Sequence, residues 1–233
     1  MKLKDLHSGI FIKRYKRFFV DIQLDTGTII TAHCPNTGRM TSCLGPGWPV
    51  KVSYNPSKTR KLSWTLQLMY NGTCWIGVNT WLANTLVQEG LEEGVLKDAF
   101  PRERTIEKEV KIANNTRLDF CVRTNKKSWY IEVKSVTYLS ESGYIEFPDA
   151  ITARGAKHLE TLIDLKKNGH GAVMFYLINR SDGTVFRPAE TIDSHYADLV
   201  RKAAQIGVLI WAYKTCIKHD EVVLGPSMPI QLT

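Results

Sequence analysis

The first third of the chain alternates short apolar runs with turn residues. The runs are rich in β-branched and aromatic residues, and clusters of Gly, Pro, Asn and Asp separate them, which is typical of β-strands. They are FFVDIQL (18–24), TIITAHC (28–34), PVKVSYN (49–55) and SWTLQLMY (63–70). Short strands with this spacing fit a small closed barrel, the five-stranded OB-fold. The pattern therefore predicts an all-β N-terminal domain over residues 1–80.

A helical pattern replaces the strand pattern near residue 80. Thr80 is a suitable N-cap residue, because its hydroxyl can accept a hydrogen bond from a free amide of the first turn. Two faces of the next segment carry apolar residues at helical spacing. One face has Leu82 and Leu86 with Glu89, and the rival face has Val87 and Leu91. We place the boundary between two domains here.

Strand and helix patterns then mix through the rest of the chain. Strands are predicted at 109–113, 117–123, 129–137, 172–178 and 208–217, with helices through 157–167 and from Asp193 onward. The order is helix, three strands, helix, strand, helix, strand. Such mixing is typical of an α/β layer structure with a mixed sheet. We therefore expect a second, α/β domain over residues 81–233.

The net charge of +8 is concentrated in the predicted barrel. Residues 1–80 hold 11 Lys and Arg and three acidic residues, whereas the remaining 20 basic and 20 acidic residues cancel. A local basic excess favours polyanion binding, since each neutralised phosphate releases counterions. The segment 14–18 also interleaves cations with aromatic rings, as in barrels that hold single strands. The expected nucleic-acid contacts are Arg14, Tyr15, Lys16, Arg17, Phe18, His33, Asn36, Arg39, Arg60 and Lys61.

Other classes of protein are disfavoured. The N-terminal residues are charged throughout, and no run of about 18 apolar residues follows. The basic third shows no amphipathic helix that would favour a membrane surface. The five cysteines lack the C-x2-C spacing of zinc sites and redox pairs, so we expect free thiols. These features predict a cytoplasmic protein with no membrane partner.

Two carboxylates and a lysine are predicted to meet in the second domain. Asp119 and Glu132 lie 13 residues apart, on strands that the polar tract 124–128 joins as a hairpin. Glu132 and Lys134 are two residues apart and therefore share a face. Carboxylate pairs bind hard cations such as Mg²⁺ or Mn²⁺, and a neighbouring Lys can orient water or stabilise charge on a phosphate. The arrangement predicts metal-assisted phosphodiester hydrolysis.

A simpler interpretation of this spacing is a solvated cross-strand salt bridge between Glu132 and Lys134, without catalytic meaning. Glu109, on the preceding strand, and Glu89, on the first helix, are further candidate metal ligands. Glu89 belongs to such a site only if its helical face points inward, where an unpaired carboxylate is costly.

Six blocks form a more specific signature: RYKRF (14–18), HCPNTG (33–38), GVNT (77–80), RLDF (117–120), YIEVKSV (130–136) and FPDA (147–150). In this order they resemble the sugar fermentation stimulation protein A family over nearly the whole chain. The resemblance implies an OB-fold domain followed by a domain similar to PD-(D/E)xK nucleases. It also implies sequence-nonspecific DNA binding and a regulatory role in sugar metabolism, particularly that of maltose.

The resemblance further implies nuclease-type residues at Asp119, Glu132 and Lys134, with Glu109 and Glu89 where similar acids occur. The chain departs from the family at Ala156, where relatives tend to carry Gln. Two functions follow: a metal-dependent nuclease whose barrel delivers the strand, or a DNA-binding regulator that uses the nuclease fold without cutting. The residues do not distinguish DNA from RNA, or a single strand from a duplex.

Overall fold

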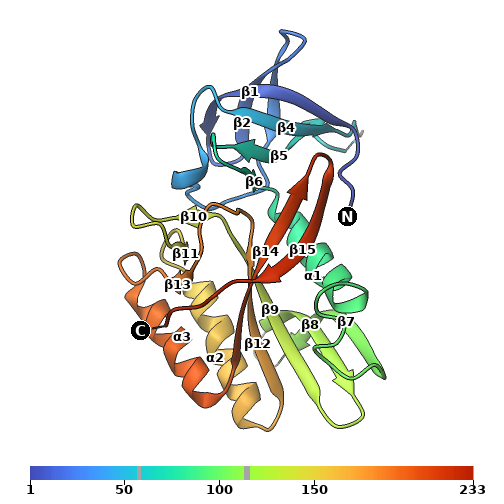
Figure 1. The fold of residues 1–233 in the computed structure, drawn as a ribbon, viewed down its shortest axis with the longest axis vertical. Helices are drawn as coiled ribbons and strands as arrows, with labels where there is room; N and C mark the ends of the chain where they lie inside the picture. The colour runs from blue at the N-terminus through green and yellow to red at the C-terminus, as the bar shows by residue number, and fades with distance from the viewer. Residues whose placement is uncertain (57–58, 113–115, 233) are drawn as a thin grey trace.

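The computed structural model describes residues 1–56, 59–112 and 116–232 and shows a barrel resting on a larger α/β domain (Figure 1). Ala113, the last residue of one predicted strand, lies outside the described residues. None of the helices in the described ranges has the length and apolar character needed to cross a membrane.

The N-terminal domain is a closed five-stranded barrel with a sixth strand added at its edge. The strand order is β3-β2-β1-β4-β5-β6, and parallel pairing of His33 with Thr65 joins β3 to β5 and closes the barrel. The strands are β1 Leu6–Tyr15, β2 Phe19–Leu24, β3 Ile29–His33, β4 Pro49–Tyr54, β5 Trp64–Tyr70 and β6 Trp75–Gly77, and the 3-10 helix η1 is Thr41–Cys43. The predicted OB-fold barrel is confirmed.

Strand β1 was not predicted, and its burial explains why. Within Leu6–Tyr15 only Gly9 and Phe11 are buried, so the strand lacks the apolar alternation that marks a half-buried strand. Gly9 is required by packing: a Cβ there would lie 2.6 Å from the carbonyl oxygen of Gln23 on β2. This close approach lets β1 cross the barrel between β2 and β4.

The second domain is built on a six-stranded mixed sheet in the order β15-β14-β12-β9-β8-β7. β9, β12 and β14 run parallel, and the flanking pairs are antiparallel. The strands are β7 Arg104–Ile112, β8 Thr116–Thr124, β9 Ser128–Val136, β12 Gly171–Ile178, β14 Leu209–Lys218 and β15 Glu221–Ser227. A small second sheet holds β10 Tyr138–Leu139, β11 Ile145–Phe147 and β13 Phe186–Pro188. The predicted mixed-sheet α/β fold is confirmed.

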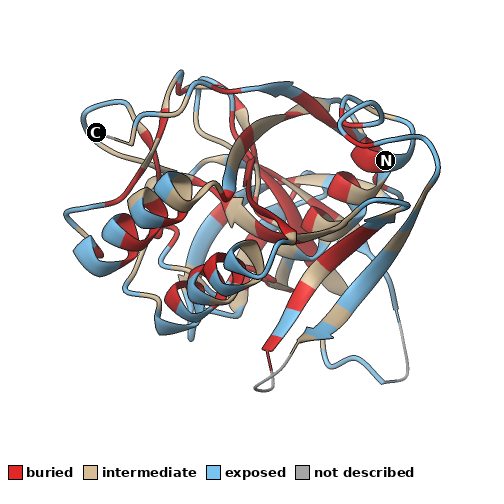
Figure 2. Ribbon diagram, turned by 90° about the horizontal axis from the view of Figure 1, so that it is seen from below, coloured by how far each residue is buried: buried red, intermediate tan, exposed pale blue. Residues whose placement is uncertain are grey.

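The helices cover both faces of this sheet. α2 (Ala153–Lys167) and α3 (Ser194–Ile206) pack on one face, and α1 (Ala83–Glu92) packs on the other. Figure 2 shows buried residues along the sheet and on the inner sides of the helices. Every residue of β12 is buried, as expected for a central strand covered on both faces. The sheet therefore has two cores, and β9 contributes side chains to both.

Two details of the predicted elements are wrong. Asn79, and not Thr80, caps the first helical segment: its side-chain oxygen accepts the amide of Trp81, and a 3-10 turn, η2 (Thr80–Leu82), precedes α1. The edge strand β15 was not predicted, because it contains Gly225 and Pro226, which normally indicate turns. Proline is tolerated in a strand at the edge of a sheet.

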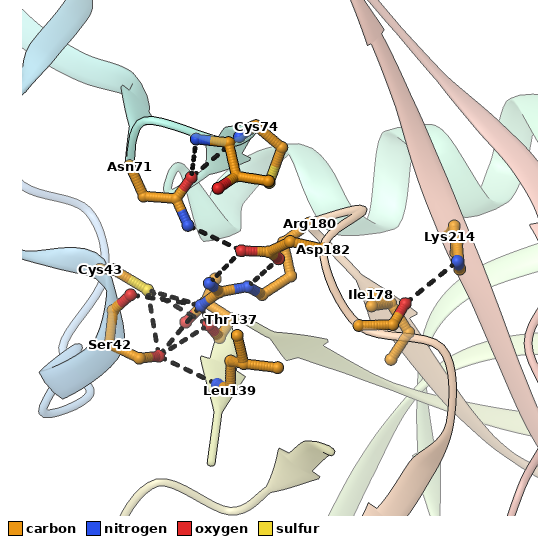
Figure 3. Close-up of polar contacts among 12 residues, drawn as sticks. Ser42, Cys43, Asn71, Cys74, Thr137, Leu139, Ile178, Arg180, Asp182 and Lys214 are labelled. Atoms are coloured by element: carbon orange, nitrogen blue, oxygen red, sulfur yellow. Dashed lines mark hydrogen bonds and ion pairs between the residues drawn. The ribbon is translucent and has the colours of Figure 1, made fainter. Parts of the chain in front are cut away.

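A buried arginine, Arg180, which is 2% exposed, bonds to groups of both domains (Figure 3). Its Nη1 donates to the carbonyl oxygen of Ser42 in the barrel, at 3.2 Å, and to that of Thr137 in the second domain, at 2.8 Å. Its Nε and Nη2 bind the carboxylate of Asp182 at 2.6 and 2.7 Å. Asn71, on the β5–β6 turn, donates to the same carboxylate at 2.7 Å. Arg180 therefore fixes the barrel on the sheet.

Replacing Arg180 with Leu is expected to lower the free energy of unfolding by about 3–5 kcal/mol, because Asp182 would remain buried without its partner. Burial works against ionisation of Asp182, yet the bonds from Arg180 and Asn71 hold its pKa at about 2. Urea denaturation measures the loss. The matched control is Arg201→Leu, which removes only exposed ion pairs and should change stability by less than about 1 kcal/mol. Equal losses in both variants would contradict this role of Arg180.

Candidate nuclease-type site and nucleic-acid interface

The predicted carboxylate pair lies where strands β8 and β9 begin to separate. The two strands are antiparallel, as predicted, and their ladder extends from Arg123 and Ser128 to Phe120 and Ile131. Asp119 and Glu132 are the next residues after this last pair. The hairpin thus brings both carboxylates to one place in the sheet.

Glu132 is buried, and only one of its two carboxylate oxygens has hydrogen-bond partners. The residue is 4% exposed, and its Oε1 accepts the ammonium of Lys134 at 2.6 Å and also contacts Nδ1 of His158, on α2. Nζ of Lys134 and Nδ1 of His158 lie 3.1 Å apart. Burial raises the pKa of Glu132, but the His158 contact and the Lys134 charge outweigh it and hold that pKa below the ordinary range. Glu132 is therefore ionised at neutral pH.

Asp119 is held by two donors from different elements. Its Oδ1 accepts the side-chain amide of Asn84, on α1, and its Oδ2 accepts the backbone amide of Val133, both at 2.7 Å. Burial, together with the negative charge of Glu132, raises the pKa of Asp119 to about 6 despite these bonds. Asp119 and Glu132 thus carry charges that oppose each other, and they follow the last paired residues of the same hairpin.

The interpretation of Glu132 and Lys134 as a solvated salt bridge is wrong. The side chains are 5% and 12% exposed, respectively, so the ion pair is buried. Burying two charges is costly and is weak support for stability by itself. A buried pair beside a second carboxylate favours a functional interpretation instead.

The two additional acids are placed elsewhere. Glu89 is 46% exposed in its side chain and pairs with the N-terminal amine at 3.0 Å, because the rival face of α1, with Val87 and Leu91, faces the core. Glu109 is also exposed and pairs with Arg117 at 3.4 Å. The expectation that these two acids complete a metal site has no support in the geometry.

The donor set still fits a hard divalent cation. Oε2 of Glu132 is one of two buried side-chain polar atoms without a hydrogen-bond partner among the described residues, and an unsatisfied buried oxygen costs about 1–3 kcal/mol. Within the same residues, no group of three or more His, Cys, Asp or Glu side chains is arranged to hold a metal. Mg²⁺ commonly binds through one or two carboxylates and keeps several waters. Asp119 and Glu132 match this number and type of protein ligand.

Sequence reasoning missed Asn84 and His158, which orient the two carboxylates. Nothing in their spacing marks them, because each comes from a helix on an opposite face of the sheet. Ala156, where the family tends to carry Gln, is buried on α2 in the core shared with α3.

Two of the predicted nucleic-acid contacts, Arg14 and Asn36, form hydrogen bonds that hold the loop after β3 in place. The guanidinium of Arg14 donates to the backbone carbonyls of Asn36, Gly38 and Arg39 at 2.7–3.1 Å, and so holds the loop after β3. Asn36 is 7% exposed, and its side-chain oxygen accepts the amide of Gly38. The carboxylate of Asp149, from the second domain, accepts the amide of Met40 and holds the same loop from the other side.

The other predicted contacts lie on the barrel, and among them Arg17 donates to the carbonyl oxygen of Thr37 in this loop. Tyr15 bonds Asp21 and stacks on Phe19, and Lys16 and Arg17 form the turn of the β1–β2 hairpin with positive φ angles. Arg39, Arg60 and Lys61 are exposed. Phe18 stacks on His33, which stacks in turn on Trp81, a residue that was not predicted.

Comparison with known proteins gives matches over the full length. Two family models match in tandem: the SfsA N-terminal OB domain at residues 12–78 and the sugar fermentation stimulation protein RE domain at residues 81–221. The sugar fermentation stimulation protein homolog of Geobacter sulfurreducens is 40% identical over 97% of each chain. The homolog of Shewanella frigidimarina is 44% identical over 98% of each chain.

This chain belongs to the sugar fermentation stimulation protein family. A solved structure of the Pyrococcus furiosus family member SfsA, in complex with Ca²⁺, superposes with a TM-score of 0.87 at 24% identity, covering 99% of this chain and 98% of that one. The shared fold includes both the barrel and the α/β domain.

The hydrogen bond from Asn84 stabilises the ionised form of Asp119, so Asn84→Leu is expected to raise the pKa of Asp119 further above about 6. The ¹³C NMR titration of the Asp119 carboxyl carbon measures this change. Gln88→Leu, one turn further along the same helix, removes only an exposed bond to Glu92 and is the matched control. An unchanged or lowered pKa in Asn84→Leu would show that Asn84 does not act on this carboxylate.

Proposed function

We propose that this protein binds DNA without sequence preference through its barrel and hydrolyses phosphodiester bonds at a divalent-metal site formed by Asp119 and Glu132. The observation that carries the proposal is the unpartnered, buried Oε2 of Glu132 beside a second carboxylate and a buried lysine. Mg²⁺ or Mn²⁺ is the expected metal, since both prefer oxygen ligands. The Pyrococcus furiosus relative in complex with Ca²⁺, another cation of this kind, agrees with the proposal.

Each side chain has a distinct role in this proposal. A bound cation would supply Lewis acidity toward the phosphate and a water of lowered pKa. Asn84 and His158 orient the two carboxylates, because Asn84 donates to Oδ1 of Asp119 and Nδ1 of His158 contacts Oε1 of Glu132. The ammonium of Lys134 keeps Glu132 ionised and places a positive charge where negative charge develops on the phosphate.

The DNA-binding part of the proposal is supported by charge. The first 80 residues carry the whole net positive charge of the chain. Among the described residues, no salt bridge involves a Lys or Arg of the expected interface; Arg14 and Arg17 donate hydrogen bonds to backbone carbonyls instead. Binding through phosphate contacts of this type weakens steeply with salt.

Asp119→Ala is expected to abolish both the binding of Mn²⁺ and the cleavage of DNA, because one of the two metal-holding carboxylates is lost. Isothermal titration with Mn²⁺ or Mg²⁺ measures the first effect, and incubation with single-stranded and duplex DNA measures the second. Glu107→Gln is the matched control: it removes a carboxylate from β7 that pairs with Arg123 at the surface. Cleavage that survives Asp119→Ala would contradict the proposed site.

The affinity for Mn²⁺ is expected to depend on pH with a midpoint set by Asp119, whose pKa is raised to about 6. Below this value the carboxyl group carries a proton that the metal must displace, so affinity should fall about tenfold for each pH unit. Above it the carboxylate is ionised and affinity should level off. Titrations at several pH values test this, and an affinity that rises on acidification would refute the assignment.

A second candidate function is a DNA-binding regulator of sugar metabolism, including that of maltose, whose nuclease fold serves as a scaffold. The separation of charge favours it, because the basic excess lies in the barrel and not around the carboxylates. Salt-sensitive DNA binding with no metal binding and no cleavage, in the parent protein, is the result that this alternative predicts.

A further inference from the structure

A row of rings crosses from the barrel to the second domain. Phe18 and His33 are nearly parallel, with 4° between their planes and 6.5 Å between their centroids. His33 stacks on Trp81 at 5.1 Å, and the guanidinium of Arg60 lies 5.7 Å from the centre of the Trp81 ring. We call these three rings, together with the guanidinium of Arg60, the ring row. They come from the β1–β2 turn, β3, η2 and the segment before β5.

The ring row is open to solvent. Phe18 is 45% exposed and Trp81 is 54% exposed, and neither belongs to the buried clusters that form the cores. Burial and the nearby charge of Arg60 lower the pKa of His33, so this ring is neutral at pH 7 and adds no positive charge between its two ring neighbours. Large exposed aromatic surfaces of this kind commonly mark binding sites.

The position of Trp81 is fixed by bonds on both sides. Asn79 accepts the Trp81 amide at 3.0 Å, and the hydroxyl of Thr80 donates to the carbonyl oxygen of Pro35 at 2.8 Å. The second bond ties η2 to the chain that leaves β3, directly after His33. The rings are therefore held in line by the backbone around them, which is the rigidity that a stacking surface requires.

The ring row is linked to the carboxylate site through the chain that leads into α1. Trp81 precedes Asn84, the residue that binds Asp119, by three positions, or about one helical turn. A polar cleft of about 220 Å³ adjoins the row, and Thr80 lines it together with Thr37, Gly38, Ser135 and Thr137. Ser135 follows Lys134 directly in β9. The cleft thus joins Thr80, the neighbour of Trp81 in the chain, to the end of β9.

We propose that the ring row, with Trp81 as its most exposed ring, is a stacking platform that holds the bases of a single-stranded nucleic acid and leads the strand toward Asp119 and Glu132. This proposal rests on the proposed function in one respect: the strand held on the platform would be the substrate of the site at Asp119 and Glu132. The exposed cations Arg17 and Lys61 directly adjoin Phe18 and Arg60 in the chain and match the charge of a phosphate backbone.

The geometry favours a single strand over a duplex. An aromatic side chain stacks on the face of a base, and in a duplex both faces of each base are covered by its neighbours. Stacking tolerates any base, which agrees with binding that has no sequence preference. Arg60 adds a cation beside the Trp81 ring that can contact a phosphate next to a stacked base.

Trp81→Ala is expected to lower the affinity for oligo(dT) of about 20 nucleotides by about 5- to 100-fold, the loss of one stacked base. Affinity for a duplex of the same length should change far less. Fluorescence anisotropy measures both, and oligo(U) in parallel shows whether RNA is held equally. Trp81→Phe retains a ring and should recover most of the binding, which separates stacking from a change in fold.

Tyr54→Ala is the matched control. Tyr54 is 42% exposed on β4 and packs against Trp64, outside the ring row, so its loss should leave oligo(dT) binding unchanged. Parent-like binding by Trp81→Ala, or an equal loss in Tyr54→Ala, would overturn the platform. Titration of Mn²⁺ into Trp81→Ala keeps the two proposals apart. Intact metal binding with weakened oligo(dT) binding supports the platform. A parent protein that does not bind metal and does not cut DNA contradicts only the proposed nuclease activity.

Discussion

The structure around the candidate site depends on one constraint: the carboxylate of Glu132 must stay ionised although it is buried in the sheet. Glu132 lies between β8 and β12, where water is excluded and a lone charge is strongly disfavoured. Lys134, two residues along the same strand, and His158, from the helix above, compensate one oxygen and leave the other without a donor. Asp119 adds a second negative charge beside it. Arrangements that are unfavourable for folding in this way are typical of functional sites.

The junction between the domains places the barrel next to this site. Arg180 binds backbone and side-chain groups of both domains, and Asp149 holds the loop after β3 from the side of the second domain. Arg14 holds the same loop from the barrel. Three charged side chains are thus engaged in fixing one loop and one interface. As a result, His33 and Trp81, which belong to different domains, stack on each other in a defined geometry.

Much of the fold could be predicted from the sequence, because its signals are local. Strands β2 to β5 of the barrel and the β8–β9 hairpin are β-type apolar runs bounded by turn residues, and β12 is a continuous apolar run. β1 and β15 could not be predicted, since one has few buried residues and the other contains Gly225 and Pro226. Both are recognised as strands only by the neighbours with which they pair.

The candidate site was predictable where its residues share one hairpin and not where they come from other elements. Asp119, Glu132 and Lys134 follow from strand alternation and loop length. Asn84 and His158 reach them from opposite faces of the sheet, so no spacing reveals them. Glu89 was misplaced because two faces of α1 carry apolar residues, and packing against β15 and the sheet chose the other face.

The most direct test of the central claim is the anomalous diffraction of crystals grown with Mn²⁺, recorded near the manganese absorption edge. The account predicts a peak in contact with Asp119 and with Oε2 of Glu132, at about the 2.0–2.2 Å expected for oxygen ligands of such ions. A peak at another position, with none between these two carboxylates, would contradict it.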